Sequence, residues 1–520
     1  MKPLEKLRTY TYIIPILLIV ILWSSCRNGL EYAPSEGNLA FSKDTVFLDT
    51  IFTNIGSTTH TLKIYNRNRD DVEIPLIKLA QGQNSKYRLN VDGVAGKEFK
   101  NIPIFAQDSI FVFIETTFDI STTTELEFLY TDAIQFDTGD NLQEVQLVTL
   151  VKDAVFLYPK TLSNGSKESL LLGLDNNSGE ILVEGFSLDD DELTFTNEKP
   201  YVIYGYAAVP DNKQLIINAG ARVHFHKDSG ILVQEGGSLQ INGMLSTDQE
   251  LLENEVVFEG DRLEDRLSTL PGQWGTIWLA AGSKNNIIDH LTIKNATVGL
   301  LVEGDGQLQS PTLSLKNTQI YNSASINLWG KTAFINAENM VLGGAGTTSL
   351  YCNLGGEYSF AHSTIANYWV NGFRAGTALQ IDNFTITSSG DRRTADLTKA
   401  NFTNCIIDGN NFLELSLRND ENTAFEYSFT NCMLKFRDDQ GQFAEDPLYN
   451  FENTERYTEI LLNQSADFVE AIENNFRIEN ESTAKGNADI DTALLVPLDI
   501  LGIDRTQIPA IGAYQIELDN

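Results

Sequence analysis

Three charged residues that could do chemistry together recur at one position of a repeated pattern. Asp289, Lys316 and Glu338 each stand directly before the polar residue that opens a four-residue motif. A lysine base beside carboxylates that bind Ca²⁺ is a set that could abstract a proton from an acidic sugar. The same charges would also form an alternating salt ladder on a solvated face. The trio is therefore a catalytic candidate with an open structural alternative, and Ca²⁺ is a cofactor only if the protein is a lyase.

Two histidines, His224 and His226, form a second candidate in the stretch RVHFHKD. Alternate residues of a strand share a face, so two imidazoles there could share a metal ion. Such a site needs a third ligand, and the sequence shows none nearby. We therefore predict no metal site.

The elements that would carry these residues are visible as a repeat. His362 begins the motif HSTI, and six motifs of the same type occur between residues 290 and 434. An apolar residue stands two positions before the leading Asn or His, and a mostly polar residue lies between them, which predicts short strands with one buried face. The leading residues are His290, Asn317, Asn339, His362, Asn383, Asn404 and Asn431.

The spacing of the motifs predicts a solenoid. They begin 27, 22, 23, 21, 21 and 27 residues apart, and a period of about 20 to 50 residues is typical of stacked repeats. Strand coils stack at about 4.8 Å, so equivalent residues form columns. Asn tolerates the left-handed turn between strands and can pass amide hydrogen bonds along the column. We interpret the seven leading residues as a structural ladder, the two histidines included.

With this ladder the chain resembles the pectate-lyase-like superfamily, in which an asparagine ladder recurs. The resemblance covers residues 201–517 and implies a right-handed parallel β-helix. The final stretch LDILGIDRTQIPAIGAYQ is also similar to the closing segment of many exported β-helix proteins. Polygalacturonan hydrolases of this type use His-Gly and Arg-x-Lys elements beside clustered aspartates, and this sequence has neither element. Arg374, Arg392 and Arg393 lie in longer loops, where the base of a lyase could sit, but no matching acid cluster accompanies them.

Aromatic residues of the solenoid could bind sugars without catalysis. Aromatic rings supply large flat apolar surfaces, and an indole also carries a polar N–H group. Each such residue could equally pack in the core or against a wall of the solenoid. The candidates are Trp274, Trp278, Trp329, Trp369 and Phe373.

The region before the solenoid is also β-rich. Residues 40–155 contain alternating runs such as SIFVFIETTF, separated by turns at the spacing of a β-sandwich. The stretch FTNIGSTTHTLKIYNRNRDDVEIPLIKL resembles Ig-like modules of bacterial surface proteins, which implies an Ig-like sandwich. We expect residues 156–200 to be a connector or a cap, because an open first coil would expose a sheet edge. The predicted fold class is all-β.

The N-terminus has the features of a targeting segment. Positive residues precede an apolar run over residues 13–23, which is shorter than a membrane span. We predict a signal peptide over residues 1–25. The ending WSSC resembles a lipobox and implies that Cys26 is lipidated, with residues 26–39 as lipidated cysteine and linker. Trp23 departs from the usual Leu, so an ordinary cleaved signal peptide or an uncleaved anchor is the alternative. Asn28 differs from the Asp that keeps similar enterobacterial lipoproteins at the inner membrane, and this resemblance implies the outer membrane.

Charge limits the partners. The chain has 37 Lys and Arg against 71 Asp and Glu, a net charge of −34, which repels nucleic acid.

Two function classes remain. The first is a non-catalytic lipoprotein of the outer membrane, facing the periplasm or the cell surface, that presents a β-helix face to a glycan or an outer-membrane protein. The second is a polysaccharide lyase or glycoside hydrolase acting on acidic polysaccharide.

Two cysteines follow the ladder directly. Cys405 and Cys432 come after the leading Asn of consecutive motifs, so they should point inward from neighbouring coils. Coil spacing brings them within reach of a disulfide, but in-register parallel strands hold the two Cβ vectors side by side. We predict buried, reduced thiols that stack as small apolar groups.

Overall fold

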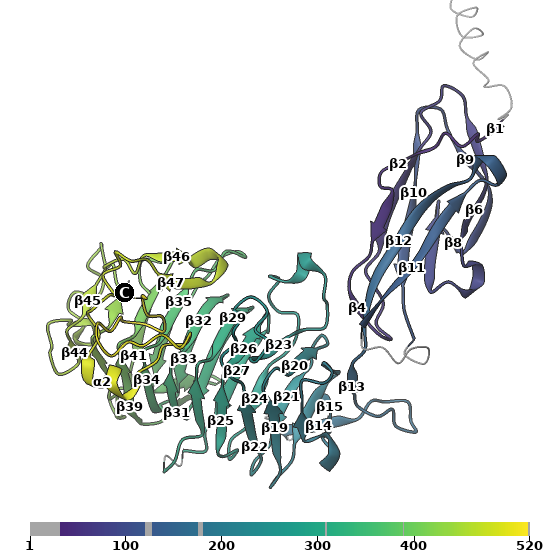
Figure 1. The fold of residues 1–520 in the computed structure, drawn as a ribbon. Coiled ribbons are helices and arrows are strands. Elements are labelled where there is room, and N and C mark those ends of the chain that lie inside the picture. Colours follow the sequence, from purple (N-terminus) through teal and green to yellow (C-terminus); the bar gives the residue numbers. More distant parts are fainter. Residues whose placement is uncertain (1–31, 120–126, 175–179, 307–308, 388, 518–520) are drawn as a thin grey trace, which may run out of the picture. The chain divides into compact units, whose positions relative to one another are not determined.

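The computed structural model describes residues 32–119, 127–174, 180–306, 309–387 and 389–517. The predicted signal peptide and Cys26 lie outside these residues. The chain divides into two compact units, Met1–Lys152 and Asp153–Asn520 (Figure 1). Both are built from strands, which confirms the all-β class. No described helix is long and apolar enough to cross a membrane.

The N-terminal unit contains two mainly antiparallel sheets that share one core. Side chains alternate along β5 and β6, so that Leu62 and Ile64 face Ile74 and Ile77 in the same buried cluster. One sheet contains β1 (Ala33–Pro34), β6 (Val72–Leu79), β9 (Glu98–Ile104), β11 (Glu127–Phe136), β12 (Gln143–Lys152), β3 (Thr45–Phe47) and β4 (Ile51–Phe52). The other contains β2 (Ala40–Phe41), β5 (His60–Tyr65), β10 (Ser109–Thr116), β7 (Tyr87–Val91) and β8 (Val94–Gly96).

The second unit consists of three long sheets of parallel strands, which the chain visits in turn. We name each sheet by its first strand. The β13 sheet contains β13 (Val155–Leu157), β17 (Tyr201–Ile203), β20 (Arg222–Phe225), β23 (Val256–Gly260), β26 (Leu291–Lys294), β29 (Gln319–Ser323), β32 (Val341–Ala345), β35 (Thr364–Asn367), β40 (Ile406–Gly409), β43 (Met433–Leu434) and β45 (Leu461–Leu462).

In the other two sheets the strands also follow one another in the order of the chain. The β14 sheet contains β14 (Ser169–Leu174), β15 (Glu180–Ser187), β18 (Tyr206–Val209), β21 (Gly230–Val233), β24 (Ile277–Leu279), β27 (Val298–Glu303), β30 (Ile326–Lys331), β33 (Thr348–Asn353), β36 (Leu379–Asp382) and β41 (Leu415–Arg418). The β16 sheet contains β16 (Thr194–Phe195), β19 (Gln214–Asn218), β22 (Ser238–Asn242), β25 (Asn286–Asp289), β28 (Leu313–Lys316), β31 (Phe334–Glu338), β34 (Gly356–Ala361), β39 (Leu397–Thr403), β42 (Ser428–Thr430) and β44 (Tyr457–Thr458).

The coil of parallel strands follows from the repeat in the sequence. Each strand pairs in register with its equivalent one coil later, as β31 does with β34. Apolar residues at alternate positions point inward and stack, because parallel pairing in register places like residues above one another. Phe360, Phe402, Phe429 and Tyr457 form such a column, with ring centroids 5.4, 5.0 and 5.6 Å apart. These sheets give the unit the β-helix character that the repeat predicts.

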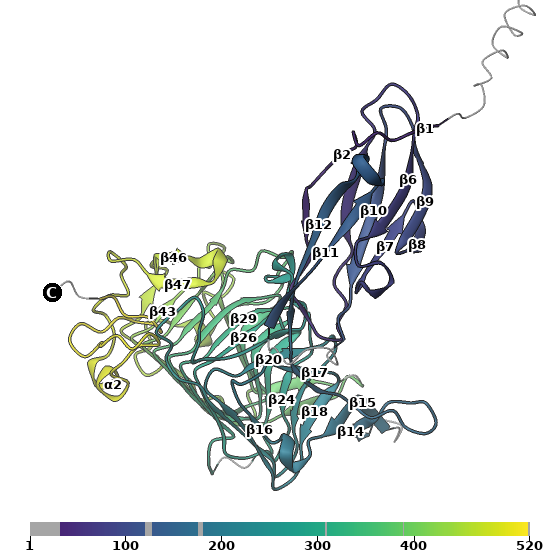
Figure 2. The same cartoon turned by 45° about the vertical axis from the view of Figure 1, so that its right-hand side comes forward.

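The parallel sheets begin before residue 201, where the sequence places the start of the solenoid. Residues 156–200, expected as a connector or cap, contain the first strands of the β14 and β16 sheets. Within them β14 and β15 form an antiparallel hairpin, and only Gly185–Ser187 of β15 pairs with β18. The rest of the hairpin extends beyond the parallel strands of this sheet (Figure 2).

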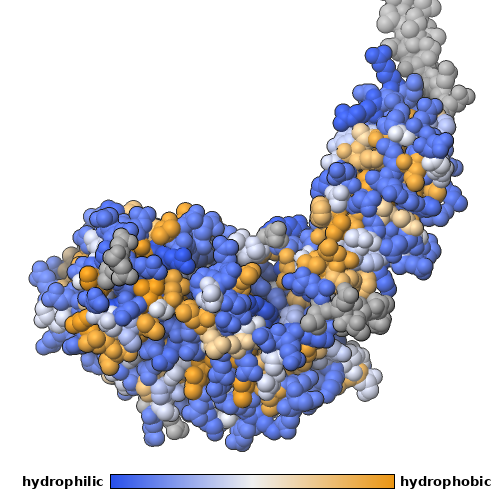
Figure 3. Space-filling view, viewed as in Figure 1, coloured by the Kyte–Doolittle hydropathy of each residue, from blue (hydrophilic) through white to orange (hydrophobic). Residues whose placement is uncertain are grey.

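The last part of the chain returns along the outside of the coils. After the hairpin of β46 (Phe468–Glu470) and β47 (Asn475–Ile478), residues 482–516 form a segment that we call the C-terminal strap. It includes the short helix α2 (Ile490–Leu495) and is yellow in Figure 1. A second hairpin, β37 (Phe384–Ile386) with β38 (Arg392–Thr394), extends from the coils. On the visible face of this unit, hydrophobic side chains form small separate patches in a largely hydrophilic surface (Figure 3).

Candidate ligand-binding groove

The charged trio lies on the outer face of the β16 sheet in register, as the repeat predicts. Asp289 pairs with Lys316 and Lys316 with Glu338 on successive coils. Lys316 Nζ lies 2.5 Å from Glu338 Oε1, and this hydrogen bond raises the pKa of the lysine. A general base must be able to lose its proton at the working pH. Lys316 is therefore held as a cation, and the geometry is that of a salt ladder.

The ladder column is real, with one correction. His290, Asn317, Asn339, His362, Asn404 and Asn431 all have positive φ, between 45° and 56°. Asn339 Nδ2 donates to Asn317 Oδ1 at 2.9 Å and so links two neighbouring members, whereas Asn317 Nδ2 donates at 2.9 Å to Oδ1 of Asp289, the residue before His290.

Asn383 was wrongly placed in this column. It follows β36 of the β14 sheet, whereas β34 pairs directly with β39, so His362 is followed in the ladder by Asn404. The amide of Asn383 instead donates to the carbonyl groups of Asp420, Thr423 and Ala424 in a loop. The step from His362 to Asn404 spans 42 residues, against 22 to 27 for the other steps, and it contains the β37–β38 hairpin.

His362 is enclosed by the C-terminal strap. Its side chain is fully buried, and Asn404 Nδ2 lies 2.9 Å from its Nε2. Burial, with the nearby charge of Arg505, lowers the pKa of His362 to about 2. The imidazole is neutral and lies away from any groove, which fits a structural role.

Acid should therefore destabilise the protein through His362. In the unfolded chain its pKa is about 6.5, so the unfolded state takes up a proton below that pH and the folded state does not. The free energy of unfolding should fall by about 1.4 kcal/mol per pH unit below about 6.5 from this group. In urea unfolding at pH 7 and pH 5, His362→Asn should remove about 2 kcal/mol of the acid sensitivity.

His226 provides a control of opposite sign. A hydrogen bond with Asp261, 2.7 Å from Nδ1, raises the pKa of His226. Its stabilising effect is therefore complete below its unfolded pKa and is lost as the pH rises. His226→Asn should increase the acid sensitivity, and an equal response of the two variants would contradict the assignment of His362.

His224 and His226 each form a hydrogen bond within the protein, His224 with the backbone of Gly260 and His226 with the carboxylate of Asp261. His224 Nδ1 lies 3.2 Å from the carbonyl oxygen of Gly260, and its pKa is lowered by burial. Among the described residues, no group of three or more His, Cys, Asp or Glu side chains is arranged to bind a metal ion.

The cysteines are reduced as predicted. Cys405 and Cys432 are buried free thiols in neighbouring coils, and the amide of Cys405 lies 3.4 Å from Cys432 Sγ. Cys352 is also a buried free thiol. Burial raises the pKa of Cys405 and of Cys352, which keeps these thiols protonated and unreactive.

Two of the aromatic candidates cannot be stacking platforms. Trp274 is 1% exposed and stacks on Phe225 in the core, with centroids 4.3 Å apart. Trp369 is 8% exposed. Both were predicted from residue type alone, and the alternative that they pack within the protein is correct.

The other three candidates reach the surface at different places. Trp278 and Trp329 point outward from the β14 sheet, and Trp329 stacks on Tyr351 at 5.8 Å. Phe373 is 91% exposed in a loop. Trp278 lines a hollow in the surface.

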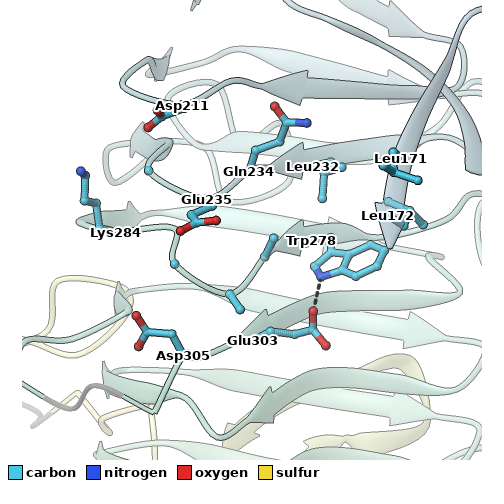
Figure 4. A pocket seen from close by; sticks show the side chains of 14 residues that line it. Leu171, Leu172, Asp211, Leu232, Gln234, Glu235, Trp278, Lys284, Glu303 and Asp305 are labelled. Atoms are coloured by element: carbon cyan, nitrogen blue, oxygen red, sulfur yellow. Dashed lines mark hydrogen bonds between the residues drawn. The ribbon is translucent and has the colours of Figure 1, made fainter. Parts of the chain in front are cut away.

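That hollow is a groove of about 920 Å³ on the outer face of the β14 sheet (Figure 4). Its floor contains Leu232 and Trp278, which are register neighbours on β21 and β24. The β14–β15 hairpin supplies one side through Leu171 and Leu172. The opposite side contains polar residues of the turns that follow successive strands: Asp211, Gln234, Glu235, Lys284 and Asp305. Glu303, the last residue of β27, lies beside the indole.

Packing of the hairpin fixes the apolar side of the groove. Leu170 is buried with Ala208 and Leu232, and Leu172 and Trp278 pack against this cluster. The indole of Trp278 is thus half-buried, with part of its ring facing the groove. A ring held in this way is pre-oriented for a flat ligand.

Glu303 fixes the indole from the polar side. Trp278 Nε1 donates to Glu303 Oε2 at 3.1 Å, and Lys331 Nζ lies 2.8 Å from Glu303 Oε1. One turn also brings a carboxylate close to the backbone of the next coil: Gly236 has φ +75°, and a Cβ there would meet the carboxylate of Asp211. The groove is therefore built from residues of several successive coils.

Of the residues that line the groove, Trp278 is the one that the sequence predicts as a binding residue. Asp211, Glu235 and Asp305 lie in turns between the β14 and β16 sheets, outside the strand motif that defines the repeat, and Glu303 ends strand β27 of the β14 sheet. The sequence signal that could have indicated the rim is an acidic residue two positions after the end of β18, β21 and β27, at Asp211, Glu235 and Asp305. Arg374 and Arg392, considered as lyase bases, are instead paired with Glu414 and Asp420.

Comparison with known proteins gives no family. No family model matches the chain, and no curated protein matches it. Among solved structures, a PapD-like domain of human CEP192 has a TM-score of 0.16 and 9% identity, over 24% of this chain and 92% of that one. The periplasmic chaperone SfaE has a TM-score of 0.15 and 10% identity, over 22% and 58%. At these scores the similarities support no assignment of fold or function.

Proposed function

We propose that the protein is an exported lipoprotein, held in the outer membrane by lipid on Cys26, that binds a glycan in the groove around Trp278 without cleaving it. In this proposal the N-terminal unit is an Ig-like sandwich that acts as a spacer. The parallel unit is a right-handed β-helix of the pectate-lyase-like type, and an outer-membrane protein remains an alternative partner for its outer faces.

The observation that carries the proposal is the composition of the groove. A half-buried indole on an apolar floor faces a polar rim of carboxylate, amide and ammonium groups. Binding sites combine apolar surface with a few convergent polar groups that fix orientation. A sugar ring offers the matching surface, since it has an apolar face and a hydroxyl edge.

Catalysis on acidic polysaccharide has less support. Lys316, the one base in the trio, is held as a cation by Glu338. The groove itself is lined by four carboxylates and one lysine, which would repel a polyanion.

Trp278→Ala should weaken glycan binding by at least about tenfold, because central aromatic residues dominate such contacts. The full chain, purified in detergent, would first be screened on immobilised neutral, amino and acidic oligosaccharides. Kd values for the best ligand would then be measured by calorimetry for both proteins. No unsaturated or shortened products should form during the incubation.

Phe373→Ala is the matched control, because it removes an exposed aromatic ring outside the groove. It should bind like the unmodified chain. Loss of binding in this variant with retention in Trp278→Ala would move the site away from the groove, and release of products would favour the enzyme.

A further inference from the structure

The charges around the groove select among glycans. Asp211, Glu235 and Asp305 are exposed at the rim, and Glu303 lies deeper beside the indole. Among the described residues that line the groove, Lys284 is the one cation, and Lys331 neutralises Glu303 from outside it. Within the described part of the chain, no ion pair joins Asp211 or Glu235 to a Lys, Arg or His side chain. The groove therefore presents negative charge that the protein does not neutralise.

The indole reinforces this preference. The face of an aromatic ring attracts a cation, and tryptophan does so best. A protonated amine beside Trp278 would meet the ring and the rim carboxylates together. A carboxylated sugar would meet repulsion from both, and a neutral sugar would gain from the ring and from hydroxyl hydrogen bonds but would form no charge pair.

We propose that the groove selects an oligosaccharide that carries free, protonated amino groups over its N-acetylated or acidic counterparts. This inference rests on the proposed function and names the class of ligand for the same site. The apolar floor recognises the face of the sugar ring, and the carboxylate rim recognises the ammonium group.

The test compares a glucosamine tetrasaccharide with the N-acetylglucosamine and galacturonate tetrasaccharides. Binding to the full chain would be measured by calorimetry at a pH where the amines are protonated, at low and at high salt. The free-amine form should bind about tenfold tighter than the N-acetylated form at low salt, because each exposed charge pair contributes modestly. The two should converge at high salt, which screens exposed charges. The galacturonate form should bind weakest.

Two variants separate charge from stacking. Asp211→Asn with Glu235→Gln keeps the shape of the rim and should remove most of the preference while preserving binding of the N-acetylated form. Trp278→Ala should weaken both forms. Spermine, a polyamine without a sugar ring, should bind more weakly than the amino sugar, and Trp278→Ala should weaken its binding less because only the cation–π contact is lost.

Equal affinity for the free-amine and N-acetylated forms would overturn the inference and leave the proposed function standing. Spermine binding as tight as that of the amino sugar would also overturn it, because charge alone would then explain the result. Absence of binding by all three oligosaccharides would overturn the proposed function as well.

Discussion

Phe402→Ala should lower the free energy of unfolding of the parallel unit by about 3–5 kcal/mol, the cost of deleting a buried aromatic ring. Phe402 is fully buried, and its ring stacks between Phe360 and Phe429. Its loss leaves a cavity between two neighbouring coils and removes both ring contacts. Urea unfolding followed by tryptophan fluorescence measures the effect, because Trp274, Trp278, Trp329 and Trp369 all belong to this unit.

Thr403→Ala is the control for this prediction. Thr403 is the next residue of β39 and points outward, so its truncation should change stability by less than about 0.5 kcal/mol. Similar losses in the two variants would mean that the inward and outward positions of the strand are wrongly assigned.

Arg374→Met should destabilise the same unit by about 3–5 kcal/mol, because it leaves a buried carboxylate without its cation. Arg374 Nη2 lies 2.5 Å from Glu414 Oε1, and both side chains are almost completely buried. Burial raises the pKa of Glu414 even beside this arginine. In the variant the raised pKa lets Glu414 take up a proton as the pH falls, so the deficit should shrink in acid. Urea unfolding at neutral and acidic pH measures both effects.

Two further variants test the cause. Arg374→Met with Glu414→Gln removes both charges and should recover part of the lost stability. Lys213→Met breaks an exposed ion pair with Asp190, 2.5 Å long, and should cost less than about 1 kcal/mol. A deficit that is independent of pH and is not reduced in the double variant would show that lost packing, and not the isolated charge, is responsible.

The repeat in the sequence predicts the strand register well because the pattern that it detects is the physical cause of the fold. The alternation through Phe402 and Thr403 separates inward from outward positions, and the ladder residues occupy the left-handed turns that Asn tolerates. The prediction that Asn383 belongs to the ladder was wrong because Ile381 and Asp382 end a strand of the β14 sheet, which has the same alternation of inward and outward residues. The two spacings of 21 residues, from His362 to Asn383 and from Asn383 to Asn404, therefore belong to a single coil and not to two.

The groove was harder to predict because it has no sequence period. Leu171 and Leu172 reach it from a hairpin that pairs antiparallel, about one hundred residues before Trp278. The rim carboxylates come from turns whose lengths differ from coil to coil. The burial of Trp274 and the exposure of Trp278, four residues apart, depend on the same three-dimensional packing, which residue type alone does not specify.

The C-terminal strap sets an order on folding. Neighbouring coils join residues about 22 positions apart, as Asn317 and Asn339 do, whereas Arg505 reaches back 166 positions to Asn339 and Tyr514 reaches back 195 to Gln319. Closing short loops is fast and closing long loops is slow. A chain that emerges N-terminus first can therefore stack its coils early, but it cannot cover His362 until residues 482–516 are available. We therefore expect the strap to pack last in folding. A chain cut before it should retain its coils but leave the ladder exposed to water.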